Sequence, residues 1–271
     1  MNFKDRIVLI TGAGSGLGRQ LALDLEKSGC RIAMGDLNEE GLLETAALLK
    51  TPEDDLFLLK ADVTNTEDCR RLVEGTIEKF GQLDICIPCA GTSMWADFLD
   101  IKDLSLFRKM IDINYLAVVD LLHFALPHLL KTRGSLVTIS SFQAVFGIAH
   151  HTAYSASKHA LNGFLAALES ELGDSIHILN VMPAWISGTN LRNNAYQASG
   201  DQGGKIRKHS RRIATVTVED CSHQIVKAIA KGKRELFQPK KAGHLRWINT
   251  LFPWFVSAFI SHHVKKQHKE K

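Results

Sequence analysis

Short runs of aliphatic residues alternate along this chain with longer stretches of helical length. The aliphatic runs are residues 7–10, 31–35, 56–61, 83–88, 135–139 and 176–182. Nearly every position in them is apolar, which is typical of parallel strands covered on both faces. The stretches of helical length include residues 19–28, 67–80, 106–130 and 154–172. This alternation predicts an α/β fold built on a doubly wound parallel sheet.

The alternation is interrupted in two places. Residues 184–215 are rich in Gly, Asn and Ser and show no clear periodicity, so they are expected to form a long loop or lid. After Pro239 the composition shifts towards aromatic residues. We therefore predict a single domain over residues 1–240, which includes the lid at 184–215, and a C-terminal aromatic and basic extension over residues 241–271.

Composition adds few constraints. The chain has 271 residues, of which 45% are hydrophobic and 23% charged, and this size allows a core without disulfides or metals. Cys86 and Cys89 have the spacing of a metal knuckle, but they lie in an apolar run without a partner pair. We expect reduced core thiols, no metal site, no signal peptide and a cytoplasmic location.

The formal net charge of +4 comes from local clusters of basic residues. One comprises Arg207, Lys208, Arg211 and Arg212, and the other Lys265, Lys266, Lys269 and Lys271. Neither is accompanied by a nucleic-acid recognition motif or by interleaved aromatic residues. A solvated surface is expected, with no nucleic-acid partner.

A glycine-rich turn, TGAGSGLG at residues 11–18, follows the first strand and opens a helix. A dinucleotide pyrophosphate needs a tight turn, close approach of the backbone and a free helix N-terminus. Gly12, Gly16 and Gly18 supply these, and Ser15 and Leu17 belong to the same turn. The alternative is a glycine-rich turn without a ligand, but its place between strand and helix favours dinucleotide binding.

Asp36 ends the second strand and bears on the choice of cofactor. Its carboxylate can accept hydrogen bonds from the adenosine ribose and would repel the additional phosphate of NADP. The four residues that follow, LNEE, include no basic side chain. NAD is therefore predicted over NADP, although an aspartate here can also serve as a turn residue or helix N-cap.

Tyr154 and Lys158 are four residues apart and share one face of a predicted helix. Hydride chemistry at an alcohol carbon needs a proton acceptor, and free tyrosine is too weak an acid for this role near neutral pH. A neighbouring Lys ammonium is expected to stabilise the phenolate and lower its pKa. Ser141, thirteen residues before the tyrosine, can bond the same substrate oxygen. Together these residues predict alcohol oxidation or carbonyl reduction.

Taken together, these motifs resemble the short-chain dehydrogenase/reductase family over residues 5–239. The resemblance also rests on the Asp62-Val63 pair, Cys89-Ala90-Gly91 and Asn114. It implies a Rossmann-type domain and four catalytic residues: Asn114 holding a water that links Lys158 to a proton relay, Ser141 positioning the substrate, Tyr154 as acid/base, and Lys158, which also bonds the nicotinamide ribose. The alternative role for Asn114 is that of a helix-interior asparagine bonded to backbone.

The resemblance implies a broad set of cofactor contacts, with Asp62 and Val63 flanking the adenine and Ile186 facing the carboxamide. The full set is Gly12, Ser15, Gly16, Leu17, Gly18, Asp36, Asp62, Val63, Ala90, Gly91, Tyr154, Lys158, Pro183, Ile186 and Thr189. The chain departs from the family at Cys89, usually Asn, and at Ala184, usually Gly. The usual threonine after Pro183 is displaced, so that either Ser187 or Thr189 takes its role.

Within the family, the chain is most similar to the dehydrogenase/reductase member 7 group, on the segments TNL at 189–191, NA at 194–195 and residues 247–271. That group implies a lipophilic alcohol or ketone substrate, and the apolar lid residues Trp185, Leu191, Tyr196 and Ile206 are compatible with one. Asp36 departs from the group's NADP-type basic residue. The alternatives are an NADPH-dependent reductase of lipid or fatty-acyl ketones and a non-catalytic dinucleotide-binding scaffold.

Two further surfaces suggest partners. The helix over residues 156–172 is apolar over a wide arc, and the resemblance implies that one face pairs with a symmetry mate in a homodimer or homotetramer. Residues 251–260 are apolar except for one serine, which is half the ~20 residues needed to span a bilayer. With the lysines that follow, residues 247–271 suit a peripheral membrane segment. A cover over the substrate pocket or a dimer contact is the alternative.

Overall fold

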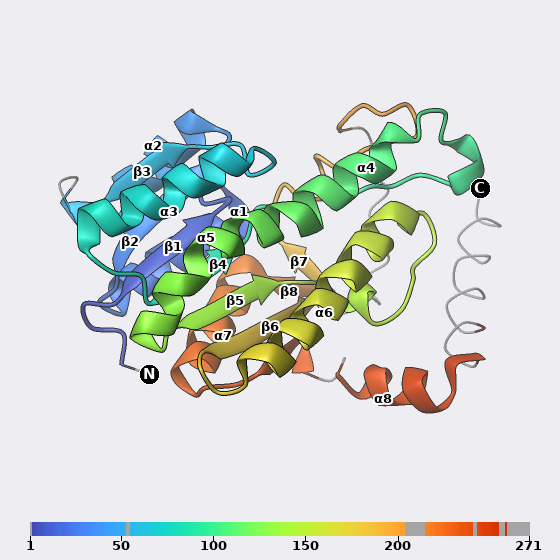
Figure 1. Ribbon diagram of the computed structural model, residues 1–271. Helices are drawn as coiled ribbons and strands as arrows, with labels where there is room; N and C mark the ends of the chain where they lie inside the picture. Colours follow the sequence, from blue (N-terminus) through green and yellow to red (C-terminus); the bar gives the residue numbers. More distant parts are fainter. Residues whose placement is uncertain (1, 53–54, 204–214, 241–242, 255–257, 259–271) are drawn as a thin grey trace.

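A computed structural model describes residues 2–52, 55–203, 215–240, 243–254 and 258. Its centre is a parallel sheet in the order β3-β2-β1-β4-β5-β6-β9, with every neighbouring pair parallel (Figure 1). The strands are β1 (Ile7–Thr11), β2 (Arg31–Asp36), β3 (Phe57–Lys60), β4 (Ile85–Pro88), β5 (Ser135–Ile139), β6 (His177–Pro183) and β9 (Glu235–Gln238). The predicted doubly wound parallel sheet is confirmed.

Helices cover both faces of this sheet. One face carries α1 (Gly16–Lys27), α2 (Glu39–Leu48) and α7 (Val218–Ala230), and the other carries α3 (Thr66–Phe80), α5 (Ala117–Thr132) and α6 (Thr152–Leu172). Strand β1 shows why its sequence is apolar throughout, because Val8 and Ile10 pack into the first core and Leu9 packs into the second. Successive side chains of a strand point to opposite faces, and here both faces are buried.

The long helix predicted over residues 106–130 consists of three consecutive parts. They are α4 (Ser105–Ile111), a π-helical turn (Asp112–Leu116) and α5. By length and composition, Ser105–Thr132 is apolar enough to cross a membrane. A core helix passes the same test, and Leu121, Leu122 and Ala125 are buried in the second core. The π-helical turn carries Asn114, and such turns are frequent at functional sites.

The sequence analysis expected a long loop over residues 184–215, but parts of this lid form regular structure. Its ends form β7 (Trp185–Ser187) and β8 (Thr215–Thr217), which pair in parallel because the segment returns to the place where it leaves the sheet. Further along, Tyr196 donates its N–H to the carbonyl of Ser93 and accepts from the N–H of Trp95. Ile206 and the basic cluster at 207–212 lie outside the described residues.

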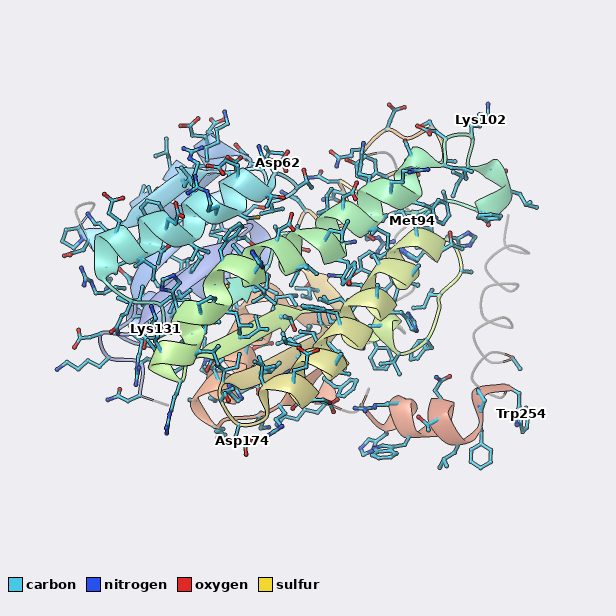
Figure 2. The ribbon with its side chains drawn as sticks, in the orientation of Figure 1. Asp62, Met94, Lys102, Lys131, Asp174 and Trp254 are labelled. Carbon is cyan, nitrogen blue, oxygen red and sulfur yellow. The ribbon has the colours of Figure 1, made fainter. Side chains whose placement is uncertain are left out.

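The C-terminal extension begins with α8 (Gly243–Leu251), which lies apart from the sheet in Figure 1. Asn249 ties this helix to the domain by donating a hydrogen bond of 3.1 Å to the carbonyl oxygen of Val145. Trp254 lies just beyond α8 in Figure 2, and it is exposed together with Trp247, Leu251 and Phe252. The lysines at 265–271 lie outside the described residues.

Candidate active site

The site is assembled at the carboxyl ends of the parallel strands. Strand β1 lies between β2 and β4, so the strand order reverses beside it, and ligands of open α/β sheets bind at such a reversal. Thr11, Asp36, Pro88, Ile139 and Pro183 are the last residues of β1, β2, β4, β5 and β6. The fold therefore brings the sequence-predicted segments that follow these strands to one edge.

The glycine turn has the shape that a phosphate-binding turn requires. Gly12 and Gly16 have positive φ angles of 68° and 52°. A Cβ atom on Gly12 would lie 2.8 Å from the Cα atom of Ala90, and one on Gly18 would lie 2.1 Å from the carbonyl oxygen of Gly12. Ser15 is the N-cap of α1, but its side chain makes no capping hydrogen bond. The first-turn N–H groups of α1 are thus available to an anion, while Leu17 is buried in the core.

Asp36 holds the neighbouring backbone in place. One carboxylate oxygen accepts from the N–H of Gly14 at 2.8 Å, and the other accepts from the N–H of Asn38 at 2.8 Å. The turn-aspartate role is therefore present in the fold. A carboxylate has about four acceptor sites, so these two bonds leave capacity for ribose hydroxyls. Leu37, the next residue, is 63% exposed.

Further predicted cofactor contacts lie after β3 and β4, with Asp62 and Val63 expected at the adenine. Asp62 accepts hydrogen bonds from the backbone and hydroxyl of Thr64, and Val63 is partly buried against the second core. Figure 2 shows Asp62 beside α3, on the same side of the molecule as the end of β3. Ala90 donates its N–H to the hydroxyl of Thr11, which draws the end of β4 against the glycine turn.

Asn114 connects the end of β4 to the helix that carries the tyrosine. Its side chain accepts from the N–H of Thr92 at 2.9 Å and donates to the carbonyl of Thr92 at 3.1 Å. It also donates to the hydroxyl of Ser157 at 3.1 Å. Gly91 lies next to it, since a Cβ atom there would be 3.2 Å from the Asn114 side-chain oxygen. Asn114 is thus bonded to backbone and also positions the segment next to Lys158.

Tyr154, Lys158 and Ser141 meet on the inner side of α6. Tyr154 is 7% exposed and Lys158 is 6% exposed, and the Lys158 Nζ atom lies 5.9 Å from the centroid of the Tyr154 ring. Lys158 donates a hydrogen bond of 2.9 Å to the carbonyl oxygen of Ile139. Ser141 accepts from the N–H of Gln143, and its side chain is close enough to Tyr154 to lower the pKa of the phenol. The structure therefore brings together the three residues that the sequence analysis associated with proton transfer.

The electrostatics differ from the expectation that Lys158 lowers the pKa of Tyr154. Burial raises the pKa of Tyr154 and outweighs the opposite effect of the bond with Ser141. Burial also lowers the pKa of Lys158 to about 8, against a smaller opposing effect of Cys89. Both shifts favour the neutral forms, because a low-dielectric interior disfavours charge on either group.

Residues at the start of the lid lie beside the glycine turn and beside the ends of the strands. Thr189 lies against the glycine turn, since a Cβ atom on Gly16 would be 3.3 Å from that of Thr189. Ser187 instead donates its hydroxyl to the carbonyl of Val216. Of the two candidates for the displaced threonine, Thr189 is the one that contacts the turn. Pro183 is buried at the end of β6, and Ile186 packs against the first core.

A group of ring side chains beside Tyr154 was missed by the sequence analysis, apart from Trp185. The group, which we call the aromatic wall, comprises Trp95, His150, His151 and Trp185. His151 lies 5.0 Å from the ring of Trp95, 5.9 Å from that of Trp185 and 6.1 Å from that of Tyr154, between centroids. Met94, labelled in Figure 2, packs between residues of α4 and α6, among them Tyr154. These residues come from three separate segments, so no local sequence signal announces them.

The chain matches established proteins over most of its length. The family model described as short chain dehydrogenase matches residues 6–200. A Dictyostelium discoideum protein named "Dehydrogenase/reductase SDR family protein 7-like" is 32% identical over 96% of this chain and 82% of its own length. An Arabidopsis thaliana protein named "11-beta-hydroxysteroid dehydrogenase-like 2" is 32% identical over 93% of this chain and 77% of its own length.

Solved structures agree on the fold. A short chain dehydrogenase/reductase from Burkholderia phymatum in complex with NAD has a TM-score of 0.79 at 18% identity, covering 92% of this chain and 94% of that one. A short chain dehydrogenase from Burkholderia cenocepacia in complex with NADP has a TM-score of 0.78 at 19% identity, covering 96% and 99%. At this level of identity the likeness establishes the fold.

Proposed function

This chain belongs to the short-chain dehydrogenase family and is a nicotinamide-dependent oxidoreductase acting on CH–OH and C=O groups. We propose that it transfers hydride between NAD(H) and a lipophilic secondary alcohol or ketone. The observation that carries the proposal is the buried meeting of Tyr154 with Ser141 and Lys158. These three residues lie at the same edge of the sheet as the glycine turn.

The glycine turn and the first turn of α1 would hold the pyrophosphate, and Asp36 the adenosine ribose. This fits the geometry, because Gly12 and Gly18 allow the turn to pack tightly against Ala90 and against itself, where a Cβ atom would clash with backbone. Ser15 also leaves the N-terminus of α1 without a side-chain cap. A nicotinamide cofactor held by these residues would supply the hydride acceptor for alcohol oxidation. The positive charge of its oxidised form would favour the Tyr154 phenolate, which burial alone disfavours.

In alcohol oxidation, the Tyr154 phenolate accepts the hydroxyl proton of the substrate. Ser141 bonds the same oxygen and fixes its position relative to the phenol. Lys158, held by the carbonyl of Ile139, keeps its ammonium close to the developing charge. In the reverse direction the neutral phenol donates its proton to the carbonyl oxygen.

NAD is favoured over NADP by the charge at the end of β2. Asp36 and the exposed Glu40 carry negative charge there, whereas Glu39 is paired with Lys60 of β3. The exposed Leu37, which directly follows Asp36, offers no positive charge to a phosphate. The bonds from Gly14 and Asn38 fix the Asp36 carboxylate in this orientation. A 2′-phosphate would meet a preorganised negative charge.

The lipophilic substrate is supported by the side chains beside Tyr154. Trp95 and Trp185 present large apolar rings there, and the backbone of Tyr196 joins the lid to the loop that carries Trp95. The name of the Arabidopsis relative refers to a hydroxysteroid, which is an alcohol of this kind. We further propose a homo-oligomer located in the cytoplasm, with peripheral membrane contact through residues 247–271.

A turnover screen tests the proposal. Wild-type protein and Tyr154→Phe are assayed with steroids, retinoids, long-chain secondary alcohols and small polyols, each with NAD and with NADP. We expect turnover of lipophilic substrates with NAD. Tyr154→Phe should lose about a hundredfold or more in rate while NADH affinity changes only a few-fold, because the phenol acts in the transition state. Activity confined to NADPH and ketones would contradict the cofactor proposal, and more than a tenth of wild-type activity in Tyr154→Phe would contradict the role of the phenol.

A further inference from the structure

The turn that follows Ser141 is bonded at its far end to the C-terminal helix α8. It is a 3-10 turn (Phe142–Ala144), and Val145 closes it by donating its N–H to the carbonyl of Phe142 at 3.1 Å. The carbonyl oxygen of Val145 accepts the hydrogen bond of 3.1 Å from the side-chain amide of Asn249. These two residues are 104 positions apart in the chain, so only the fold brings the extension to this turn.

The direction of the Ser141 hydroxyl depends on the geometry of the turn. Its oxygen accepts a hydrogen bond of 3.1 Å from the N–H of Gln143, the middle residue of the turn. The backbone carbonyl of Ser141 accepts from the N–H of Ala144 at 3.0 Å. A displacement of the turn would therefore turn the hydroxyl away from the substrate oxygen. Since a misplacement of about 1 Å can cost about a hundredfold in rate, even a small displacement affects the reaction.

Two other side chains that hold the turn belong to α6. The Ser155 hydroxyl donates to the side-chain oxygen of Gln143 at 2.9 Å, and the side-chain amide of Asn162 donates to the carbonyl of Ala144 at 3.2 Å. Because α6 also carries the catalytic tyrosine, these bonds fix the middle and the last helical residue of the turn relative to it. Neither bond reaches the carbonyl that accepts from Asn249.

Helix α8 is itself fixed to the edge of the sheet. Arg246, three residues before Asn249 and therefore on the same side of the helix, forms an ion pair with Glu235, the first residue of β9. Gly243 lies against Phe237 of the same strand, since a Cβ atom there would be 3.3 Å from the ring. The amide of Asn249 is thus presented to the turn from a helix with two further contacts to β9.

We propose that Asn249 is a positioning residue for the reaction, which keeps the hydroxyl of Ser141 directed at the substrate oxygen by holding the end of the turn. This rests on the proposed function, in which Ser141 bonds that oxygen. The exposed Trp247 and Leu251 are each two positions from Asn249, which is about 200° around the helix axis. They therefore lie on the opposite side of α8, and the extension combines an exposed apolar face with a contact to the catalytic turn.

Hydrogen exchange followed by mass spectrometry tests this contact without turnover. Asn249→Leu has a side chain of similar size without an amide donor, whereas Asn249→Gln retains a donor. We expect Asn249→Leu to raise amide exchange about tenfold in peptides covering residues 141–146, as for the loss of one hydrogen bond, and Asn249→Gln to restore part of the protection. Thr250→Val, which removes a hydrogen bond within α8, is the matched control and should leave these peptides unchanged. Unchanged exchange in Asn249→Leu would overturn the proposal.

A double-mutant cycle tests the link to the serine. Oxidation of 2-decanol at saturating NAD is measured for wild type, Asn249→Leu, Ser141→Ala and the double variant. We expect Asn249→Leu to lower kcat about tenfold with NADH affinity unchanged. In the Ser141→Ala background the same substitution should have no further effect, because the positioned hydroxyl is already missing. An equal loss in both backgrounds would overturn the proposal, because Asn249 would then only support the fold.

Failure of the proposed function has a different result. Full activity of Ser141→Ala would contradict the role of the serine, and the positioning role of Asn249 would fail with it. Absence of Tyr154-dependent turnover of any alcohol in the screen would contradict the proposed function alone. The exchange measurement would then still decide whether Asn249 holds the turn.

Discussion

The Nζ atom of Lys158 lies 2.9 Å from the carbonyl oxygen of Ile139, at the end of β5, and donates a hydrogen bond to it in a buried setting. The Lys158 side chain therefore lies in the same buried environment as Tyr154. Burial lowers the pKa of Lys158 from 10.5 to about 8 and raises the pKa of Tyr154. Without a cofactor, the pair is therefore held largely in its neutral forms in mildly alkaline solution.

The first prediction concerns stability. Because the folded-state pKa of Lys158 is below its unfolded value, wild type loses stability to the buried charge below about pH 8 and recovers it as pH rises towards 10.5. The stability of Lys158→Met relative to wild type should therefore fall by about 2–3 kcal/mol between pH 7 and pH 10. Urea unfolding at several pH values measures this. Lys131→Met on the surface of α5 is the control, and an unchanged difference for Lys158→Met would contradict the prediction.

The second prediction concerns the pH dependence of catalysis. Burial raises the pKa of Tyr154, so the phenolate is a minor species at neutral pH and its fraction grows as pH rises. With NAD at saturating concentration, kcat/KM for alcohol oxidation should increase about tenfold for each pH unit until the tyrosine is deprotonated. A deuterated alcohol shows whether hydride transfer limits the rate. A flat profile under such limitation would exclude Tyr154 as the base.

The third prediction concerns cofactor choice. Asp36→Ala combined with Leu37→Arg should shift the ratio of NADPH to NADH affinity by about tenfold or more towards NADPH, because repulsion is removed and a phosphate partner is added. Fluorescence titration measures both affinities. Asp36→Asn is the matched control, since it removes the charge and keeps one of the two oxygens that accept from the N–H groups of Gly14 and Asn38. Tighter binding of NADPH than of NADH by wild type would refute the NAD assignment.

The fourth prediction concerns assembly. In α6 the side chains of Leu161, Leu165 and Leu168 are buried in the core, whereas Gly163 and Ala166 are exposed. A Cβ atom on Gly163 would meet no atom within 4 Å, so a larger side chain fits the monomer. Gly163→Glu should therefore convert a homodimer or tetramer into smaller species without lowering the stability of the subunit. Light scattering measures the mass, and a wild-type mass near 30.1 kDa at micromolar concentration would contradict the oligomer.

The fifth prediction concerns the C-terminal extension. Deleting residues 247–271 should reduce sedimentation with anionic liposomes, because it removes exposed Trp247, Leu251, Phe252 and Trp254 and the lysines beyond them. Each lysine near an anionic surface contributes about 1 kcal/mol, which high salt removes. Liposome sedimentation in low and high salt measures the effect. If wild type does not bind liposomes while the deletion abolishes substrate affinity, the extension covers the pocket.

The features that could be predicted from the sequence are those that depend on local residue patterns. Six of the sheet strands and the order of the motifs follow from apolar runs and glycine spacing, as the glycine turn after β1 illustrates. The choice between Ser187 and Thr189 depended on the path of the lid and could not be made from spacing. The aromatic wall joins three segments, so only the fold brings Trp95 and His151 together. The pKa of Tyr154 was predicted with the wrong sign because burial is a tertiary property that a Tyr/Lys spacing does not contain.

The pairing of β7 with β8 has a consequence for how this protein can be modified. The pairing of Ser187 with Thr217 closes the lid segment at its base. The entropy of closing such a segment grows only slowly with its length, so replacement segments of different length would cost the fold little. Changes of length in the lid that keep Thr189 against the glycine turn and Tyr196 bonded to Ser93 and Trp95 are therefore expected to leave the sheet and the tyrosine helix as they are.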